Sequence, residues 1–567
     1  MTHKNTAGKP RLICLYLSEK GRVLANRISP TTLPLSEVKI GEVFTSFDQI
    51  VFVTTAAIAV RSIAPHISSK ATDPSVVCVD EDGYYAIPLL GGHRGANALA
   101  KTIAATIGGE PVITNPSDRS DTYTLNSFAG YHAVGDIPHF QAQLNSGIRP
   151  KVTNSTGWPL PAALADSATS VDGPEILISI ARPDLAHLGL VGSVQLIPEL
   201  LVVGIGCSSD ATPEEVASAL EATMIESNLA NEAISAFATI DIRKDHPAIV
   251  ALKHPTIFFD SSQLAQVVVP NPSSAVLGAV GSASVAEAAA ILGSGSPDGL
   301  IVSKRKFRAV TVAVAQRSAK PGRLFVVGLG PGNPDLRTLQ AAKTISHVEV
   351  VTGFGPYVDL CSDLLSPNQK VKRFPIGEET HRVDFAIDSA IAGYEVALVC
   401  SGDPGVFAMA SLAFERAEIL GFDPTLITVV PGVTAALAAS AVVGAILGHD
   451  HAYISLSDLM TPWKVIEERV SAVARADLVA AFYNPKSSRR ISQLDKAIGI
   501  IAGFRPATTP VVIARAVGRD HQSVKIVRLG DFRSDEVDME TLVIVGSTTS
   551  TFAGIRAYTP RGYSEKK

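Results

Sequence analysis

Three glycine–proline loops, each directly after a short apolar run, constrain most strongly how the second half of this chain can fold. The loops are residues 328–334 (GLGPGNP), 401–407 (SGDPGVF) and 430–436 (VPGVTAA), and the apolar runs before them are residues 324–328, 396–400 and 427–429. Short apolar runs ended by Gly and Pro are typical of β-strands, and helical stretches between them indicate parallel α/β units. The carboxyl ends of parallel strands lie along one edge of a sheet, so we expect the three loops to converge on one crevice.

A dinucleotide site is one interpretation of the first loop, because a strand, glycines and a helix follow one another in the required order. The sixth position of the fingerprint is Asn333 instead of glycine. The next predicted strand, residues 348–351, ends at Thr352 without the acidic residue that would bind a ribose. A nicotinamide-dependent oxidoreductase is therefore a less favoured hypothesis, which a measurement of NAD binding tests.

The composition indicates a folded, multidomain protein and argues against several classes of function. The 567 residues carry a net charge of −5, and the basic cluster at residues 304–306 is too short to indicate a nucleic-acid binder. The five cysteines are scattered without a C-x-x-C pair, which argues against disulfides and a metal site and fits a reducing cytoplasm. Neither an apolar signal core nor a run long enough to span a membrane is evident, so we expect a cytoplasmic protein.

We expect an α/β protein of several domains. Strands are predicted at residues 11–17, 50–53, 200–204, 267–269 and 309–315, and helices at residues 98–107 and 435–447. A helix with an N-cap at Thr212 and a proline at its first position is also predicted. The predicted domains are residues 1–115, a small intermediate domain or insertion at 116–195, residues 196–316, a linker at 317–322, and residues 323–567.

Residues 323–567 closely resemble the tetrapyrrole methylase family, and within it the precorrin-3B C17-methyltransferases that contract the corrin ring. The three loops carry this resemblance together with residues 454–463, 482–487 and 538–541. It implies two α/β subdomains that bind S-adenosyl-L-methionine between them and methylate a tetrapyrrole. The cofactor-binding residues that it implies are Pro331, Gly402, Asp403, Val406, Phe407, Thr434, Ala435 and Asn484.

Ring contraction also needs proton transfer to or from oxygen, for which His449, Asp450 and Asp458 are candidate acid–base groups. The alternative is that they are solvated or capping residues. Tyr483 or Arg515 is a candidate contact for the macrocycle, because its carboxylate arms favour guanidinium partners.

Residues 11–315 resemble the cobalt-precorrin-5A hydrolase family, which opens the ring-A lactone and releases acetaldehyde. Residues 92–97, 238–245 and 284–289 carry this resemblance. Lactone hydrolysis needs a base and an oxyanion donor, and the candidate catalytic residues are His93, with Asn97 one turn later, and Glu287. The alternatives are that His93 caps a helix and that Glu287 is an exposed helix position.

The leading hypothesis is a fusion of two cobalamin-biosynthesis enzymes. Its substrates would be precorrin-3B or cobalt-factor III for the methyltransferase and cobalt-precorrin-5A for the hydrolase, and the family resemblance implies a homodimer. Neither nucleic acid nor a membrane is an expected partner. A second hypothesis assigns the N-terminal half to binding a labile tetrapyrrole without catalysis.

Overall fold

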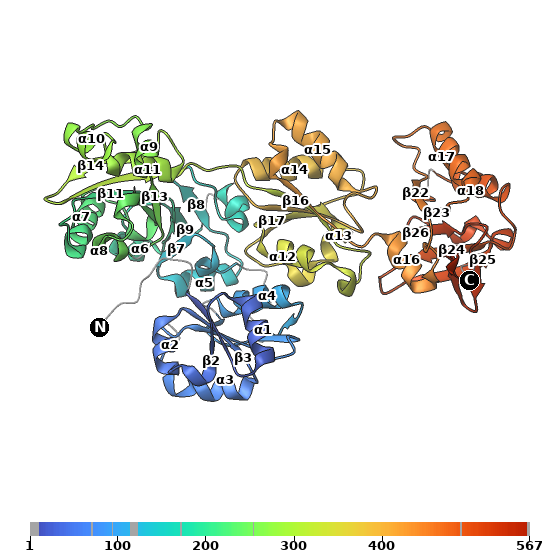
Figure 1. The fold of residues 1–567 in the computed structure, drawn as a ribbon, viewed down its shortest axis with the longest axis horizontal. Helices are drawn as coiled ribbons and strands as arrows, with labels where there is room; N and C mark the ends of the chain where they lie inside the picture. Colours follow the sequence, from blue (N-terminus) through green and yellow to red (C-terminus); the bar gives the residue numbers. More distant parts are fainter. Residues whose placement is uncertain are drawn as a thin grey trace. The chain divides into compact units, whose positions relative to one another are not determined.

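The protein is described by a computed structural model that covers residues 11–69, 72–92, 95–113, 123–169, 173–252, 254–487 and 490–563. The chain divides into two compact units. The first comprises the chain up to Pro321 with two short later segments, Ser366–Lys370 and Ala392–Tyr394, and the second comprises the rest of the chain from Gly322 onward. Each unit is an α/β structure and is described by itself (Figure 1).

The first sheet of the first unit lies between two layers of helices (Figure 1). Its order is β2-β1-β3-β4-β5-β6, formed by β1 (Leu12–Tyr16), β2 (Thr32–Pro34), β3 (Gln49–Val53), β4 (Ser75–Val79), β5 (Tyr85–Leu90) and β6 (Glu110–Pro111). Helices α1 (Glu19–Ile28) and α4 (Ala96–Ile107) pack on one face, and α2 (Ile40–Ser46) and α3 (Ala56–Ile63) pack on the other. The predicted strands at 11–17 and 50–53 are confirmed, and the predicted helix begins two residues early, at Ala96.

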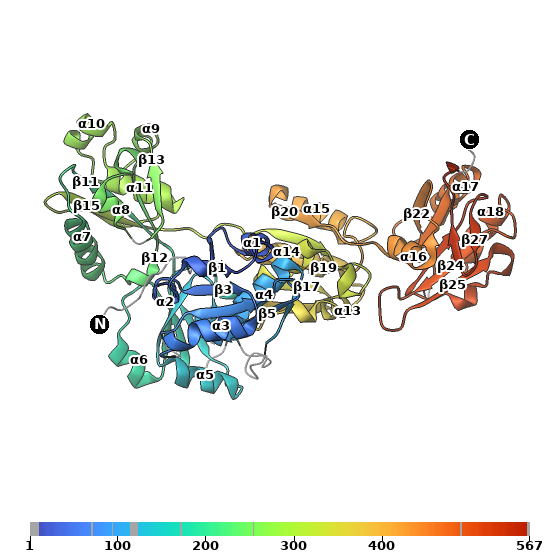
Figure 2. The ribbon, with the colours of Figure 1, turned by 60° about the horizontal axis from the view of Figure 1, so that its bottom comes forward.

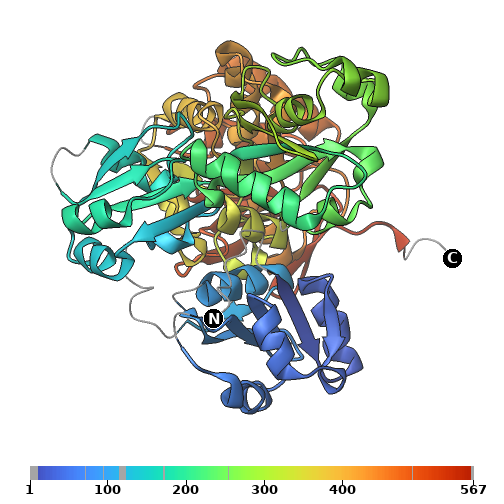
Figure 3. The same cartoon turned by 90° about the vertical axis from the view of Figure 1, so that its left-hand side faces the viewer.

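A separate four-stranded sheet, cyan in Figure 3, occupies the stretch in which an intermediate domain or insertion is predicted. Its order is β7-β10-β9-β8, formed by β7 (Tyr131–Gly135), β8 (Lys151–Asn154), β9 (Glu175–Ile178) and β10 (Val194–Pro198), with α5 (Ile137–Asn145) and α6 (Leu185–Val191) between strands. The sheet does not test the predicted domain limits, which stay predictions.

The third sheet has the order β13-β12-β11-β15-β14. Its elements are β11 (Leu201–Cys207), α7 (Pro213–Glu226), β12 (Ile234–Ile240), α8 (Pro247–Val250), β13 (Thr256–Phe259), α9 (Ser261–Ala265), α10 (Ser274–Val280), α11 (Val285–Ser294), β14 (Leu300–Lys306) and β15 (Val310–Gln316). Helix α7 begins with a full capping box, in which the Thr212 hydroxyl accepts from Glu215 N–H and the Glu215 carboxylate accepts from Thr212 N–H.

The strand predicted at residues 267–269 is wrong. These residues follow α9 without pairing to a strand, and the Val268 side chain is 92% exposed. Pro270 and Pro272 follow directly and cannot donate to a ladder, so this β-branched run has no place inside the sheet. The predicted strands at 200–204 and 309–315 are confirmed as β11 and β15.

The second unit begins with a sheet whose order is β18-β17-β19-β16-β20. Its strands are β16 (Leu324–Gly328), β17 (Val350–Phe354), β18 (Lys370–Phe374), β19 (Val396–Cys400) and β20 (Ile427–Val430). Helices α14 (Glu379–Ile391) and α15 (Met409–Leu420) lie on one side, and α12 (Leu339–His347) and α13 (Gly355–Asp359) lie on the other (Figure 1). Because β16 runs parallel to both β19 and β20, the loops after these three strands leave the sheet at the same edge.

A second sheet of this unit has the order β22-β23-β26-β24-β25. Its strands are β22 (His451–Ser455), β23 (Val479–Tyr483), β24 (Pro510–Arg515), β25 (Ser523–Arg528) and β26 (Thr541–Val545). Helix α16 (Ala435–Val443) covers one face, and α17 (Trp463–Arg475) and α18 (Gln493–Ala502) cover the other (Figure 2). The helix predicted to reach residue 447 ends at Val443, because Gly444 has a positive φ of 130° and begins β21 (Gly444–Ala445), which pairs with β28 (Arg556–Tyr558) beside β27 (Thr551–Ala553).

All five cysteines are free, and four of them are buried. Burial raises the pKa of the Cys14, Cys361 and Cys400 thiols to about 12. Within the described ranges no cluster of three or more His, Cys, Asp or Glu side chains is arranged to hold a metal ion. Among the same residues no single helix is long and apolar enough to cross a membrane, although the bent pair α10 and α11 reaches that threshold by length and composition.

Candidate functional site

The three glycine–proline loops of the second unit meet, as the sequence predicts. Gly330 and Gly402 exchange two backbone hydrogen bonds, of 3.2 and 2.7 Å. The Asp403 carboxylate accepts from Gly405 N–H at 2.8 Å and from Gly432 N–H at 3.1 Å, so it joins the second loop to the third. The backbone of these three loops therefore forms the base, or floor, of the crevice predicted at this edge of the sheet.

Glycine is required where these loops touch. A Cβ on Gly432 would lie 2.1 Å from the Gly402 carbonyl oxygen, and a Cβ on Gly328 would lie 2.6 Å from the same oxygen. Real Cβ atoms do not approach backbone oxygens this closely. Any larger residue at either position forces the loops apart.

A pocket of about 400 Å³ opens above this floor, within the size range of small-molecule sites. One part of its wall comes from the first sheet and its helices: Tyr357, Glu379, Arg382, Val399, Cys400 and residues 401–403 and 406–409. The other part comes from the second sheet and α16: Thr434, Ala435, Tyr483, Asn484, Ala514, Val517, Arg519 and residues 539–542.

The structure brings seven of the eight residues predicted to bind the cofactor into this one pocket: Gly402, Asp403, Val406, Phe407, Thr434, Ala435 and Asn484. Pro331, the eighth, is not part of the pocket wall, and its carbonyl accepts a hydrogen bond of 3.4 Å from Arg519 Nε. Their shared location agrees with a common ligand, and their role in binding it stays a prediction.

Of the five non-glycine residues with positive φ in the described part of the chain, two line the pocket and a third, Ala516, precedes the pocket residue Val517. Phe407, Asn484 and Ala516 have φ angles of 51°, 50° and 49°, a left-handed conformation that side chains other than glycine rarely adopt. Such strain, about 1–3 kcal/mol per residue, persists only where the surrounding structure imposes it, and it is common at functional sites.

A row of aromatic rings leads to the pocket from β22 and β23. Ring centroids are 5.2 Å apart for Phe407 and Tyr483, 5.6 Å for Tyr483 and Tyr453, and 5.4 Å for Tyr453 and His451. The Tyr483 hydroxyl lies 2.6 Å from Thr434 Oγ1 and accepts from Ala436 N–H at 3.1 Å. Burial raises the pKa of Tyr483, so its phenol stays neutral at physiological pH.

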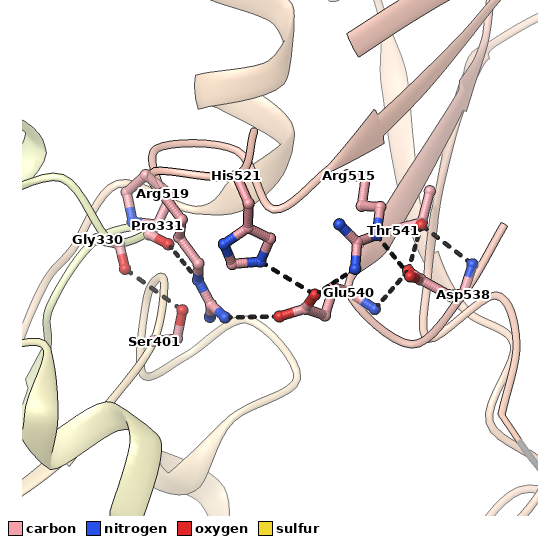
Figure 4. A network of polar contacts seen from close by, with 9 residues as sticks. All are labelled: Gly330, Pro331, Ser401, Arg515, Arg519, His521, Asp538, Glu540 and Thr541. Atoms are coloured by element: carbon pink, nitrogen blue, oxygen red, sulfur yellow. Dashed lines mark hydrogen bonds and ion pairs between the residues drawn. The ribbon is translucent and has the colours of Figure 1, made fainter. Parts of the chain in front are cut away.

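A charged network lies beside the pocket (Figure 4). Glu540 accepts from Arg515 at 2.9 Å and from Arg519 at 3.1 Å, and it lies 3.2 Å from His521 Nε2. Arg515 also donates to Asp538 at 2.6 Å. Although partial burial of Asp538 alone would raise its pKa, hydrogen bonds from Arg515 and Thr541 hold that pKa below its usual value. Arg515, a predicted macrocycle contact, is thus committed to two carboxylates.

The predicted acid–base residues for ring contraction lie outside the pocket wall. His449 and Asp450 are on the exposed turn before β22, where Asp450 N–H donates to His449 Nδ1 at 2.7 Å. Asp458 is exposed and accepts from Gln493 Nε2 at 2.7 Å. The structure does not bring these three side chains together with the predicted cofactor residues.

Glu287, the predicted base of the N-terminal half, is fully buried in the first turn of α11 and not exposed as the alternative interpretation requires. Its Oε1 accepts from Asn271 Nδ2 at 2.8 Å and from Lys304 N–H at 3.0 Å, and its Oε2 accepts from Asn271 N–H at 3.3 Å. Lys304 Nζ in turn donates to the Asn271 carbonyl, and burial lowers the pKa of this ammonium group. His93 lies outside the described residues.

Sequence reasoning missed Tyr357, Glu379, Arg382 and Arg519, which all line the pocket. Glu379 and Arg382 are one helical turn apart at the start of α14, a spacing that indicates a shared helix face but not what that face meets. Arg519 lies four residues after Arg515, which the sequence analysis names as a candidate macrocycle contact, so its position was a usable signal.

Comparison with known proteins identifies this unit. The family model of tetrapyrrole (corrin/porphyrin) methylases matches residues 323–533. A probable cobalt-factor III C(17)-methyltransferase of Salmonella typhimurium is 39% identical over 241 residues, which are 42% of this chain and 99% of that protein. The chain belongs to the tetrapyrrole methylase family. A precorrin-3B C(17)-methyltransferase of a Sinorhizobium species is 38% identical over 250 residues, 43% of this chain and 98% of that protein.

Two further family models match the first unit of this tetrapyrrole methylase: cobalamin synthesis G N-terminal at residues 39–118 and cobalamin synthesis G C-terminus at residues 201–315. The chain is therefore a fusion of cobalamin-biosynthesis proteins. The crystal structure of the methyltransferase CobJ is 37% identical and covers 42% of this chain and 100% of its own, with a TM-score of 0.41. Two further curated relatives, from Priestia megaterium and Archaeoglobus fulgidus, are matched over only 46% and 54% of their own length.

Proposed function

We propose that residues 323–567 transfer the methyl group of S-adenosyl-L-methionine to C17 of precorrin-3B or cobalt-factor III, with ring contraction to the precorrin-4 level. Family membership supports the reaction class. The observation that carries the proposal for this chain is the convergence of seven predicted cofactor residues on one pocket whose floor is backbone.

The pocket fits a methyl donor of this kind. Val406, Phe407 and Leu542 offer apolar surface, while the side chains of Arg382 and Glu379 offer charges of both signs for an amino-acid end. When bound, the donor supplies an electrophilic methyl group on a sulfonium. The chain's own contribution is to enclose and orient the reactants, which supplies much of the rate in a transfer that needs no covalent enzyme intermediate.

The aromatic row offers a place for the macrocycle. Tyr453, Tyr483 and Phe407 are successive neighbouring rings, the last two of which line the pocket, and conjugated ligands pack well against aromatic side chains. The Thr434 contact and the Ala436 N–H fix the Tyr483 hydroxyl, so this ring does not need to reorganise when a ligand arrives.

The proposed acid–base groups of ring contraction remain His449, Asp450 and Asp458. Only their positions in the sequence support this assignment. If one of them acts in that step, its alanine or asparagine variant produces a methylated macrocycle with an uncontracted ring. A contracted product at the normal rate removes that residue from the mechanism. Mass and absorption spectra of the product distinguish the two outcomes.

The direct test of the methyltransferase is incubation of the full chain with methyl-labelled S-adenosylmethionine and, separately, precorrin-3B and cobalt-factor III. We expect label in one of the two macrocycles, and the preferred one identifies whether cobalt is already inserted. Absence of transfer to both refutes the proposal. Calorimetry with NAD in the same preparation should detect no binding that competes with S-adenosylmethionine.

We also propose that the first unit opens the ring-A lactone of cobalt-precorrin-5A and releases acetaldehyde. The cobalamin synthesis G matches support this, together with the Glu287–Asn271–Lys304 cluster. The buried Glu287 carboxylate is closed to bulk water, so its proposed role is to hold Asn271 and the Lys304 backbone in position, with His93 as the proposed proton shuttle or substrate contact.

Acetaldehyde release from cobalt-precorrin-5A by the full chain tests the hydrolase. We expect release by the wild type and a large loss in Glu287→Gln and in His93→Ala, with methyl transfer by the other unit unchanged. Binding of the substrate without release of acetaldehyde contradicts hydrolysis and supports the alternative, an N-terminal half that binds a tetrapyrrole without catalysis.

A further inference from the structure

Arg382 is a buried cation in the wall of the pocket. It lies in the first turn of α14, its side chain is 7% exposed, and it is one of the residues that line the pocket. Nη2 donates to Glu379 Oε1 at 3.2 Å, and Nε lies 3.4 Å from the Met409 sulfur, a weak acceptor. Nη1 is buried and has no hydrogen-bond partner among the described residues.

A buried donor of a charged group that lacks a partner is costly, because it has lost its water without gaining another acceptor. Most buried polar atoms in proteins have a hydrogen-bond partner, so we interpret the unpartnered Nη1 of a residue in the pocket wall as a donor for a ligand atom. The planar fork of a guanidinium matches the two oxygens of a carboxylate. The N-terminal end of the 13-residue helix α14 adds partial positive charge at the same place.

The acidic groups of the pocket do not satisfy this donor. Asp403 already accepts from two backbone N–H groups, and Glu540 already pairs with Arg515 and Arg519. Glu379 binds Nη2 of Arg382 and leaves Nη1 unpaired. Arg382 therefore has one donor held by Glu379 and one donor that no carboxylate of the pocket satisfies.

We propose that Arg382 binds a carboxylate of the ligand in this pocket. This inference rests on the proposed function, which provides two sources of that group: the amino-acid end of S-adenosylmethionine and the acetate and propionate arms of the macrocycle. Glu379, beside Arg382, would pair with the ammonium group of the amino-acid end in the first case and has no equivalent role in the second.

The experiment uses the full chain and three probes. S-adenosylhomocysteine carries the amino-acid carboxylate, 5′-methylthioadenosine is the same nucleoside without it, and uroporphyrin III is a stable porphyrin octacarboxylate. Arg382→Met removes the charge, and Arg382→Lys keeps a cation without the forked donors. Arg416→Met is the matched control, because Arg416 is a partly buried arginine of α15 that pairs with Asp384 and does not line the pocket.

If the donor supplies the carboxylate, Arg382→Met weakens S-adenosylhomocysteine binding by at least about tenfold, the loss typical of a charge-assisted hydrogen bond, and leaves methylthioadenosine binding unchanged. If the macrocycle supplies it, uroporphyrin III binding falls by a similar factor and S-adenosylhomocysteine binding is unchanged. In both cases Arg382→Lys recovers part of the loss, and it replaces the methionine variant if that variant does not fold. Arg416→Met changes neither affinity.

The proposal is overturned if Arg382→Met and Arg382→Lys leave the affinities for S-adenosylhomocysteine and uroporphyrin III unchanged. It is also overturned if S-adenosylhomocysteine and methylthioadenosine weaken by the same factor, since that result reports a distorted pocket instead of a lost carboxylate contact. A wild-type chain that binds neither S-adenosylhomocysteine nor uroporphyrin III refutes the proposed function itself, which is a different result.

Discussion

At the scale of single residues, Gly432 controls whether the three loops can meet. A Cβ at this position would lie 2.1 Å from the Gly402 carbonyl oxygen, so Gly432→Ala should separate the second loop from the third. We expect at least about tenfold weaker binding of S-adenosylhomocysteine and a lower melting temperature, a loss of the size seen for strained or overpacked sites. Calorimetry and thermal denaturation measure the two effects.

Gly499→Ala is the control for that substitution. Gly499 lies within α18, where an added Cβ meets no atom within 4 Å. Alanine in a helix interior is more stable than glycine by about 0.5–1 kcal/mol, so this variant should keep its affinity and gain a little stability. Equal affinities in both variants would show that the loop contact does not shape the site.

The Asp538–Arg515 pair gives a residue-scale prediction of pH dependence. The folded state holds the pKa of Asp538 below its usual value of 3.8, so the pair's contribution to stability is present above that pH and is lost as pH falls through the lower, folded pKa. The melting-temperature difference between the wild type and Asp538→Asn should therefore shrink between pH 7 and pH values below 3.8. A difference that stays constant over this range, or matches that of the exposed neighbour Asp535→Asn, contradicts the assignment.

At the scale of elements, the capping box of α7 gives the clearest prediction. Thr212→Ala removes the hydroxyl that accepts from Glu215 N–H and should destabilise the helix by about 1 kcal/mol. Hydrogen exchange of the first α7 amides should become faster, whereas Thr212→Ser keeps the oxygen and the protection. Unchanged exchange in the alanine variant would mean that tertiary packing alone holds this helix end.

The strands beside the site could be predicted because each is a short apolar run followed by a loop that contains glycine and proline. β16 and β19 are buried apolar runs that end at Gly328 and before Ser401, and the structure has both at the predicted residues. The run at 267–269 is also apolar and rich in valine, yet no strand among the described residues pairs with it, and composition does not reveal partners.

The loop residues of the site could be predicted, while its helix residues could not. Glycine and proline favour turns through their own backbone conformations, so the 401–407 and 430–436 loops can be recognised from the sequence. Arg382 and Glu379 belong to a helix with other charged positions, and only the packing of α14 beside β19 turns these two toward the pocket. That Arg382 Nη1 has no hydrogen-bond partner within the described part of the chain is a property of three-dimensional packing alone.

At the scale of the whole molecule, the two units should carry separable activities. In the full chain, Gly432→Ala should strongly reduce methyl transfer and leave acetaldehyde release from cobalt-precorrin-5A intact. Glu287→Gln should strongly reduce acetaldehyde release and leave methyl transfer intact. The reason is that each substituted residue belongs to one compact unit. Loss of both activities in either variant would indicate that the units depend on each other. Sedimentation of the same samples tests the expected homodimer.

The position of the transferred methyl group tests the central claim most directly. The full chain is incubated with S-adenosylmethionine carrying a ¹³C-labelled methyl group and with cobalt-factor III or precorrin-3B, and the product is examined by NMR. The account predicts one labelled methyl at C17 of a ring-contracted macrocycle, and a weaker signal in Gly432→Ala. Label at another carbon, or an unlabelled macrocycle with both substrates, would contradict the account.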